Sequence, residues 1–176
     1  MLTGPPGAGK TTVARLLADW LEPSVHLLGD EFWHYIRRGL IPPFEPASHH
    51  QNEVVMGIVA SAAFGYAAGG YQVICDGIVG PWFIEPFRGA AATTGLPLHY
   101  VVLRPDEATL LSRATSRRAS DALVDAGPIR SLHAQFADLG ELEPHAFDTT
   151  RMTPDATAAA VRDALGAHRY RLSKSA

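Results

Sequence analysis

The sequence predicts an α/β fold, in which a parallel sheet of about five strands carries helices on both faces. Strand-like and helix-like segments alternate along the 176 residues, and no repeat, heptad or polar linker interrupts them. Such alternation is typical of a parallel sheet, whose ligands bind beyond the carboxyl ends of the strands. The length suits one domain over residues 1–176. We therefore expect one site, at one edge of one sheet.

The strands are expected from short apolar runs and the helices from apolar residues at helical spacing. Residues 12–21 have helical periodicity, and residues 25–28 form an apolar run that Gly29 and Asp30 end. Three prolines between residues 42 and 46 indicate a loop, and the aromatic, proline-broken stretch 77–87 indicates a loop or short helix. The other strands are expected at residues 71–75, 99–103 and about 147. The other helices are expected at residues 32–38, 51–68, 106–118 and 154–168.

The first strand is short. Only Met1, Leu2 and Thr3 precede Gly4, whereas a strand that leads into such a loop normally has about five residues. The sequence therefore predicts either an unusually short central strand or further residues ahead of Met1.

Composition and charge restrict the binding partners and the cellular compartment that we expect for this protein. The net charge of −3 gives no general basic field, so we expect no nucleic-acid partner. Cys75 is the single cysteine, and the chain enters a glycine loop at once instead of a signal peptide. These features predict a cytoplasmic protein. The uncharged stretch 54–75 is long enough to suggest a membrane span, but Gly69 and Gly70 split it into a helical half and a strand half, so we expect no membrane partner. The oligomeric state is left open.

Residues 4–11, GPPGAGKT, match the pattern G-x-x-x-x-G-K-[ST] at every fixed position. The glycines let successive backbone N–H groups surround phosphate oxygens, Lys10 reaches the β- and γ-phosphates, and Thr11 offers a hydroxyl to Mg²⁺. An ordinary glycine-rich turn is the alternative, but the full pattern lies between a strand-like start and an amphipathic helix. The motif predicts a three-layer P-loop NTPase fold that binds ATP or GTP with Mg²⁺. The residues expected to hold the nucleotide here are Gly4, Pro5, Gly7, Ala8, Gly9, Lys10, Thr11 and Thr12.

Asp30 follows the second predicted strand, which we expect beside the first strand and thus near the γ-phosphate. Phosphoryl transfer to an alcohol needs a positioned carboxylate, so Asp30 is the candidate catalytic base. An aspartate before a helical run is also a common N-cap, and the two roles are compatible. Glu31 either faces the substrate or favours the first helical turn through its charge.

Asp76 ends the strand 71–75, where an aspartate helps to hold Mg²⁺ in related architectures. We expect Asp76 to contact the metal, together with Thr11, or the substrate. The alternative is that Asp76 only closes a loop by capping it.

Arginines follow the strand 99–103. Arg113, Arg117 and Arg118 lie on one predicted helix, and Arg130 lies beyond the stretch ASDALVDAGP. Arginines on a mobile segment can neutralise the charge that builds on a transferred phosphoryl group, although a solvated helical face is the alternative. We expect Arg113 and Arg117 to act in catalysis, Arg113 also to bind the nucleotide, and a mobile lid to lie near residues 114–135.

Aromatic residues gather after two strand ends, around Trp33 and around Trp82 and Phe83. Core packing explains some of them, but their place beside the expected reaction centre suggests a substrate pocket with flat apolar walls. His49 and His50 lack a third ligand at metal spacing, so we interpret them as loop histidines.

Together these residues resemble the small P-loop kinases of the nucleoside-monophosphate-kinase-like group, in particular the chloramphenicol phosphotransferase-like branch. GPPGAGKTT, LLGDEFW, YQVICDG, LRPDEATLLSRATSRR and HAFDTT occur in the order of that branch and cover most of the chain. The resemblance implies that Asp30 is the catalytic base, that the arginine helix borders a lid, and that the loop at Thr149 lies near the nucleotide base.

Three functions are compatible with these observations. The preferred one is an NTP-dependent phosphotransferase that moves the γ-phosphate to a hydroxyl of a small molecule, with antibiotic self-resistance as one role. A nucleoside-monophosphate or sugar kinase is the second. A nucleotide-binding switch without transfer activity is the third. The sequence selects neither ATP over GTP nor the acceptor.

Overall fold

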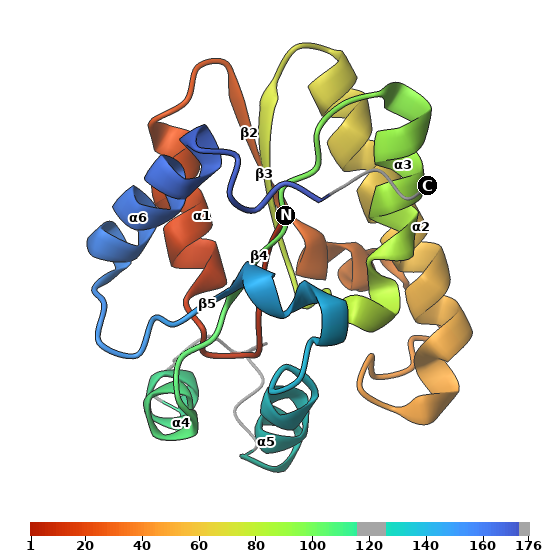
Figure 1. Ribbon diagram of the computed structural model, residues 1–176. Coiled ribbons are helices and arrows are strands. Elements are labelled where there is room, and N and C mark those ends of the chain that lie inside the picture. Colours follow the sequence, from red (N-terminus) through yellow and green to blue (C-terminus); the bar gives the residue numbers. More distant parts are fainter. Residues whose placement is uncertain (116–125, 173–176) are drawn as a thin grey trace.

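The computed structural model describes residues 1–115 and 126–172, and its centre is a five-stranded sheet in the order β2-β3-β1-β4-β5 (Figure 1). Every neighbouring pair of strands is parallel. The strands are β1 (Leu2–Thr3), β2 (Ser24–Leu28), β3 (Gln72–Asp76), β4 (Val101–Leu103) and β5 (Ala146–Phe147). Their carboxyl ends all lie at the same edge of the sheet, as the alternating sequence predicts.

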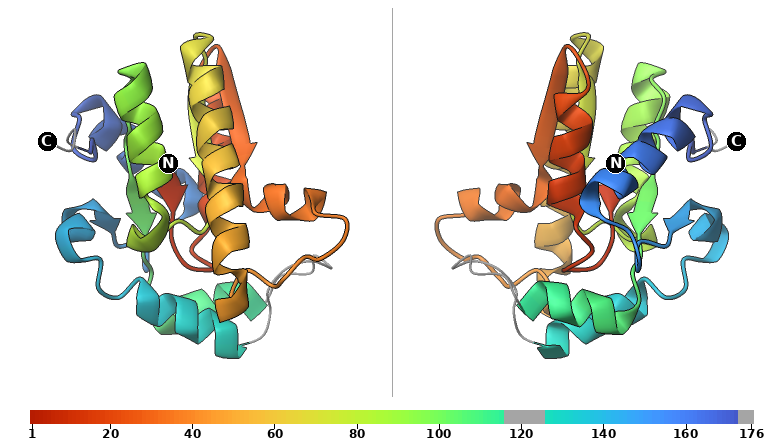
Figure 2. Two further views of the ribbon diagram at one scale, coloured as in Figure 1. Left: turned by 90° about the vertical axis from the view of Figure 1, so that its right-hand side faces the viewer. Right: turned by 90° about the vertical axis from the view of Figure 1, so that its left-hand side faces the viewer.

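Helices cover both faces of the sheet (Figures 1 and 2). α1 (Lys10–Asp19) and α6 (Pro154–Gly166) pack together on one face, and α2 (His49–Ala68) and α3 (Glu85–Thr94) pack together on the other. α4 (Glu107–Thr115) and α5 (Ala126–Gln135) lie against each other beyond the carboxyl ends of the strands. This three-layer arrangement confirms the predicted fold class.

Each face of the sheet has its own apolar core. On the α1 and α6 face, Leu17, Val101 and Val161 are buried, and on the α2 and α3 face Val59, Phe64 and Phe87 are buried. Burying each such side chain contributes roughly 1.5–3 kcal/mol. The two cores hold the strand ends, and the loops that follow them, in fixed positions.

Short 3₁₀ helices follow two of the strands. η1 (Gly29–Tyr35) comes directly after β2, where we expected an α-helix over residues 32–38, and η3 (Pro81–Phe83) lies between β3 and α3. The remaining ones are η2 (Pro46–Ser48) before α2 and η4 (Gly140–His145) before β5. α3 and α5 were not expected from the sequence.

One topological expectation was wrong. β2 lies at the edge of the sheet and pairs only with β3 among the described strands, so it is not the neighbour of β1. Asp30 therefore stands two strands from the phosphate loop, with Asp76 at the end of the strand between them.

The uncharged stretch 54–75 is divided as expected, because α2 ends at Ala68 and β3 begins at Gln72. Over residues 1–115 and 126–172, no helix has both the length and the apolar character that crossing a membrane requires.

Candidate active site

The phosphate loop joins β1 to α1, and two of its glycines are fixed by close neighbours. Gly4 has φ 140°, and a Cβ there would lie 2.2 Å from the carbonyl oxygen of Leu103 on β4. Gly7 has φ 91°, and a Cβ there would lie 2.6 Å from the carbonyl oxygen of Leu110 on α4. Any side chain at either position would push a neighbouring element away. The loop is thus packed between the sheet and α4.

Lys10 begins α1 and lies over the loop. Its side chain is 5% exposed, and Nζ donates to the carbonyl oxygen of Pro5 at 3.2 Å. The N-terminus of α1, with Gly9 as its N-cap, is directed toward the same place. An ammonium group and a helix N-terminus that converge in this way form an electrostatic site for an anion.

Thr11 and Asp76 meet at the carboxyl end of β3. The Thr11 hydroxyl Oγ1 donates to Asp76 Oδ2 at 2.7 Å, and Asp76 is 4% exposed. The two residues predicted to hold Mg²⁺ are therefore in direct contact. A hydroxyl and a carboxylate supply the hard oxygen ligands that Mg²⁺ prefers, with phosphate oxygens and waters completing its shell. The described residues contain no group of three or more His, Cys, Asp or Glu side chains that could hold a metal ion.

His26, which sequence reasoning missed, contacts the other oxygen of the same carboxylate. It lies on β2, and its Nε2 is 2.9 Å from Asp76 Oδ1. An ionised carboxylate only accepts hydrogen bonds, so Nε2 is the protonated nitrogen of the ring. The two bonds fix the plane of the Asp76 carboxylate. No local signal could have identified His26, because it belongs to an apolar strand and its partner lies 50 residues away.

Asp30 is exposed at the start of η1, and its Oδ1 accepts from the N–H of Ile78 at 3.3 Å. The N-cap of η1 is Leu28, so Asp30 is not the cap. Asp30 Oδ1 also lies 3.3 Å from the Cβ position of Gly77, the residue that follows Asp76. Two carboxylates thus stand at the ends of adjacent strands. Glu31 is exposed, and its Oε2 lies 3.1 Å from His34 Nδ1.

The predicted pocket aromatics have different surroundings. Trp33 is 7% exposed in the core, and its indole N–H donates to Asn52 Oδ1 at 2.9 Å. Trp82 is 40% exposed and meets Phe136 edge to face, with ring centroids 5.3 Å apart. Phe83 stacks on His49 at 5.9 Å. Trp82, which is exposed, and Phe83, which is partly buried, form an aromatic surface on η3 beside the strand ends, whereas Trp33 belongs to the core.

His49 and His50 were interpreted as loop histidines, and this was wrong. Both lie in the first turn of α2, and each has a ring nitrogen within 4 Å of a Glu53 carboxylate oxygen.

Arg113 connects α4 to the loop that follows β5. Its Nη2 donates to the carbonyl oxygens of Thr149 and Met152, at 3.3 and 3.4 Å. The Thr149 hydroxyl is buried and has no hydrogen-bond partner among the described residues. The loop expected near the nucleotide base therefore contains a buried hydroxyl, and Arg113 holds the backbone of the same loop. Arg117 and Arg118 lie outside the described residues, as does the central part, 116–125, of the expected lid.

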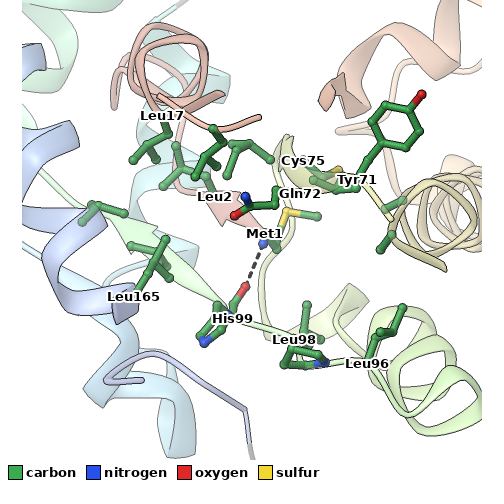
Figure 3. Close-up of a pocket in the computed structure, with 18 of the residues that line it drawn as sticks. Met1, Leu2, Leu17, Tyr71, Gln72, Cys75, Leu96, Leu98, His99 and Leu165 are labelled. Carbon is green, nitrogen blue, oxygen red and sulfur yellow. Dashed lines mark hydrogen bonds between the residues drawn. The ribbon is translucent and has the colours of Figure 1, made fainter. Parts of the chain in front are cut away.

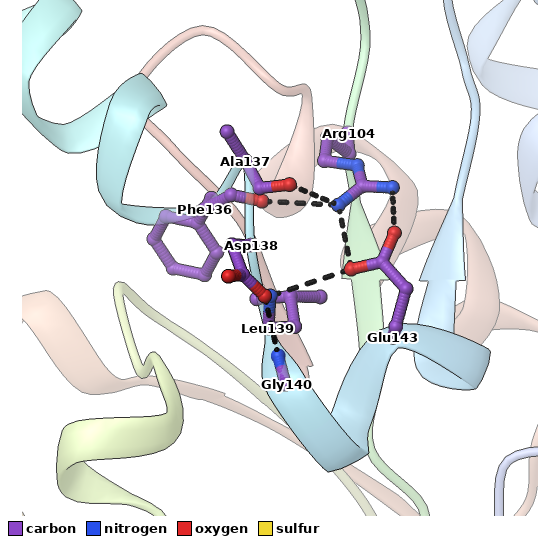
Figure 4. A network of polar contacts seen from close by, with 7 residues as sticks. All are labelled: Arg104, Phe136, Ala137, Asp138, Leu139, Gly140 and Glu143. Carbon is purple, nitrogen blue, oxygen red and sulfur yellow. Dashed lines mark hydrogen bonds and ion pairs between the residues drawn. The ribbon is translucent and has the colours of Figure 1, made fainter.

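Another arginine, Arg104, holds α5 and η4 to the sheet (Figure 4). It was not singled out from the sequence. Arg104 Nη1 donates to the carbonyl oxygens of Phe136 and Ala137, both at 3.2 Å, and the guanidinium also pairs with Glu143. The hydrogen bond from the Arg104 guanidinium to Glu143 holds the pKa of that carboxyl below its usual value. Because the Phe136 ring supports Trp82, the Arg104 contacts also fix the aromatic surface.

This geometry agrees with comparisons to known proteins. A family model described as an AAA domain matches residues 1–139. The chain belongs to this family. The search of curated proteins finds no match.

Several solved structures have folds similar to the fold of this chain. The tunicamycin resistance protein of Deinococcus radiodurans is 20% identical over 94% of this chain and 93% of its own, with a TM-score of 0.68. A sugar kinase from Janibacter sp. HTCC2649 is 18% identical over 94% and 92%, with a TM-score of 0.70. The shikimate kinase of Acinetobacter baumannii is 19% identical over 95% and 92%, with a TM-score of 0.61. The fold is that of the P-loop kinases of the nucleoside-monophosphate-kinase-like group, as the sequence predicted.

Proposed function

We propose that this protein is an NTP-dependent phosphotransferase that moves the γ-phosphate to a hydroxyl group of a small molecule. The observation that carries the proposal is the contact between Thr11 and Asp76, at the N-terminus of the phosphate-loop helix and one strand from Asp30. A nucleotide-binding loop alone would need no second carboxylate at this edge. Membership of the AAA domain family supports nucleotide binding, and the kinase fold supports transfer.

In the proposed reaction the acceptor oxygen forms a bond to the γ-phosphorus, and the bond from that phosphorus to the β–γ bridging oxygen breaks. Asp30 takes the proton of the attacking hydroxyl, and its carboxylate is exposed to solvent where an acceptor could reach it. Lys10 and the loop amides hold the phosphates, and Arg113 holds the loop beside the base. Mg²⁺, held by Thr11 and Asp76, would neutralise phosphate charge. The products are a phosphate ester and a nucleoside diphosphate.

The acceptor is proposed to be uncharged and to lie against Trp82 and Phe83. A monophosphate acceptor needs a cluster of cations, whereas this surface is aromatic. The named neighbours act on, or give resistance to, hydroxylated small molecules: one is a sugar kinase, one a shikimate kinase and one a tunicamycin resistance protein. Antibiotics and sugars are therefore the first acceptor classes to test.

The test is a screen of purified protein with ATP and with GTP against a library of hydroxylated compounds, followed by mass analysis of the products. Transfer to at least one acceptor is expected, and Lys10→Ala should abolish it while leaving the circular dichroism spectrum unchanged. Near-normal turnover in the folded Lys10→Ala protein would refute the phosphate-loop mechanism. Nucleotide-dependent partner binding that persists in Asp30→Asn, with no transfer by the parent protein, would favour the switch.

A further inference from the structure

A cavity of about 600 Å³ interrupts the sheet at the end opposite to the phosphate loop (Figure 3). Apolar side chains line it from both helical layers: Leu17 and Leu165 from one, Phe64 and Phe87 from the other. Because it is lined from both layers, the cavity is a gap within the sheet and not a groove on one face. Its position is directly ahead of Met1, between β3 and the residues that precede β4.

The gap has the width of one strand. β1 pairs with β3 only at Leu2, opposite Asp76, whereas β3 pairs with β2 from Gln72 onward. In Figure 1 the N-terminus lies part-way along the sheet, and β2 and β3 continue beyond it. Counting back from the register, Met1 lies opposite Cys75, so Ile74, Val73 and Gln72 are three positions of β3 without a partner on the β1 side among the described residues.

Backbone groups of β3 point into this gap. Gly77 N–H donates to the Leu2 carbonyl oxygen on the β1 side, whereas Gln72 N–H donates to the Pro23 carbonyl oxygen on the β2 side. Peptide groups alternate between the two sides of a strand, so the N–H groups of Val73 and Cys75 point the same way as that of Gly77, toward the gap. Buried backbone donors are almost always paired in folded proteins. The gap therefore has the hydrogen-bonding pattern of a strand.

Met1 already occupies a place in this ladder. Its amino group donates to the His99 carbonyl oxygen at 2.7 Å, and its carbonyl oxygen accepts from Val101 N–H at 3.0 Å, as residues of a parallel strand do (Figure 3). The amine is buried, which lowers its pKa. A charged amine in an apolar gap is costly, whereas a peptide N–H in the same position is the ordinary donor of a ladder.

We propose that the gap holds an extended apolar segment of three residues, joined to the amino side of Met1 by a peptide bond and parallel to β3 and β4. Its carbonyl groups would accept from the N–H groups of Cys75, Val73 and His99, and β1 would reach the usual strand length of about five to six residues. A separate peptide fits less well, because its carboxylate would lie against the Met1 amine, and both charges would be buried. The apolar lining requires side chains such as valine and isoleucine.

The test adds four residues, Met-Val-Ile-Val, ahead of Met1, and uses Met-Gly-Ser-Gly as a matched extension. The apolar extension should raise Tm by about 5–10 °C and slow amide exchange at Cys75 and His99 at least tenfold, with little change in η1. It should also prevent binding of the apolar dye anilinonaphthalene sulfonate to the cavity. The Gly-Ser extension also replaces the buried amine by a peptide N–H, so it should raise Tm, but by less than the apolar extension, and it should leave amide exchange and dye binding nearly unchanged.

Three outcomes would overturn the proposal. Equal stabilisation by both extensions would mean that length or loss of the amine is sufficient. Dye binding that survives the apolar extension, with unchanged amide exchange, would assign the cavity to a small apolar molecule. A Tm of the unextended protein that rises with its own concentration would assign the gap to a strand from a second copy. None of these measurements depends on nucleotide binding or transfer.

Discussion

Replacing His26 by phenylalanine should weaken Mg²⁺ binding at the proposed site of Thr11 and Asp76 and leave nucleotide binding by the phosphate loop largely unchanged. The ring shape is kept, but Asp76 Oδ1 loses the donor 2.9 Å away, and the carboxylate is only 4% exposed, so water replaces that donor poorly. Leaving a buried acceptor unpaired costs about 1–3 kcal/mol. Loss of a group that orients a metal ligand weakens metal binding about 10–100-fold, which is roughly 1.4–2.7 kcal/mol, so the two estimates agree.

The assay is calorimetric binding of a nucleoside diphosphate at graded Mg²⁺ concentrations. The Mg²⁺ concentration at half-effect should rise about 10–100-fold in His26→Phe, while affinity for the metal-free nucleotide stays within about twofold. His34→Phe is the matched control, because His34 makes a similar contact to Glu31 but is exposed on η1. An unchanged Mg²⁺ dependence, together with a lowered Tm, would show that His26 supports the fold and does not orient Asp76.

Three further predictions concern the acceptor side and the N-terminus. Asp30→Asn should lower kcat about 10²–10⁴-fold in single-turnover assays with nearly unchanged nucleotide affinity, and a wild-type rate would refute the base assignment. Trp82→Ala should raise the KM of the acceptor more than that of the nucleotide, and the reverse order would move Trp82 to the nucleotide site. Burial lowers the pKa of the Met1 amine from 8.0, so folding favours the neutral amine, and stability should fall as pH drops from about 8.5 to 6.5. Burial raises the pKa of the nearby Cys75 thiol to about 12, which changes stability only at the alkaline end of this range, and lowers the pKa of His99 from 6.5, which changes it only at the acid end. Melting curves of the protein with and without the Met-Val-Ile-Val extension should therefore diverge across it, and parallel curves would count against a buried amine.

The sequence predicted the layers and the strand ends because both depend on local pattern. Apolar runs closed by Gly29 or Asp76 gave β2 and β3 to within one or two residues. The strand order could not be predicted in this way, because it depends on which crossovers pack, and β2 was placed beside β1 instead of β3.

The contacts in the candidate site also fall into two groups, those that local sequence pattern predicts and those that it does not. Thr11 was expected to act with Asp76, because the phosphate-loop motif identifies Thr11 and the end of an apolar strand identifies Asp76. The contacts of His26 with Asp76 and of Arg104 with Glu143 join residues 50 and 39 positions apart, and neither pair has a motif. Only the folded chain brings them together.

In the proposed function, the residues on the acceptor side lie in one stretch of the chain, and this stretch also contains Asp76 at the end of β3. Residues 24–95 supply β2, η1, α2, β3 and η3 as one uninterrupted block, whereas the phosphate loop, α4 and the loop after β5 lie outside it. Under the proposed function, recombination that exchanges this block between two relatives would carry the acceptor-side residues and Asp76 with it, and would leave the phosphate loop in place. New acceptors could then be acquired by exchanging one contiguous segment of the gene.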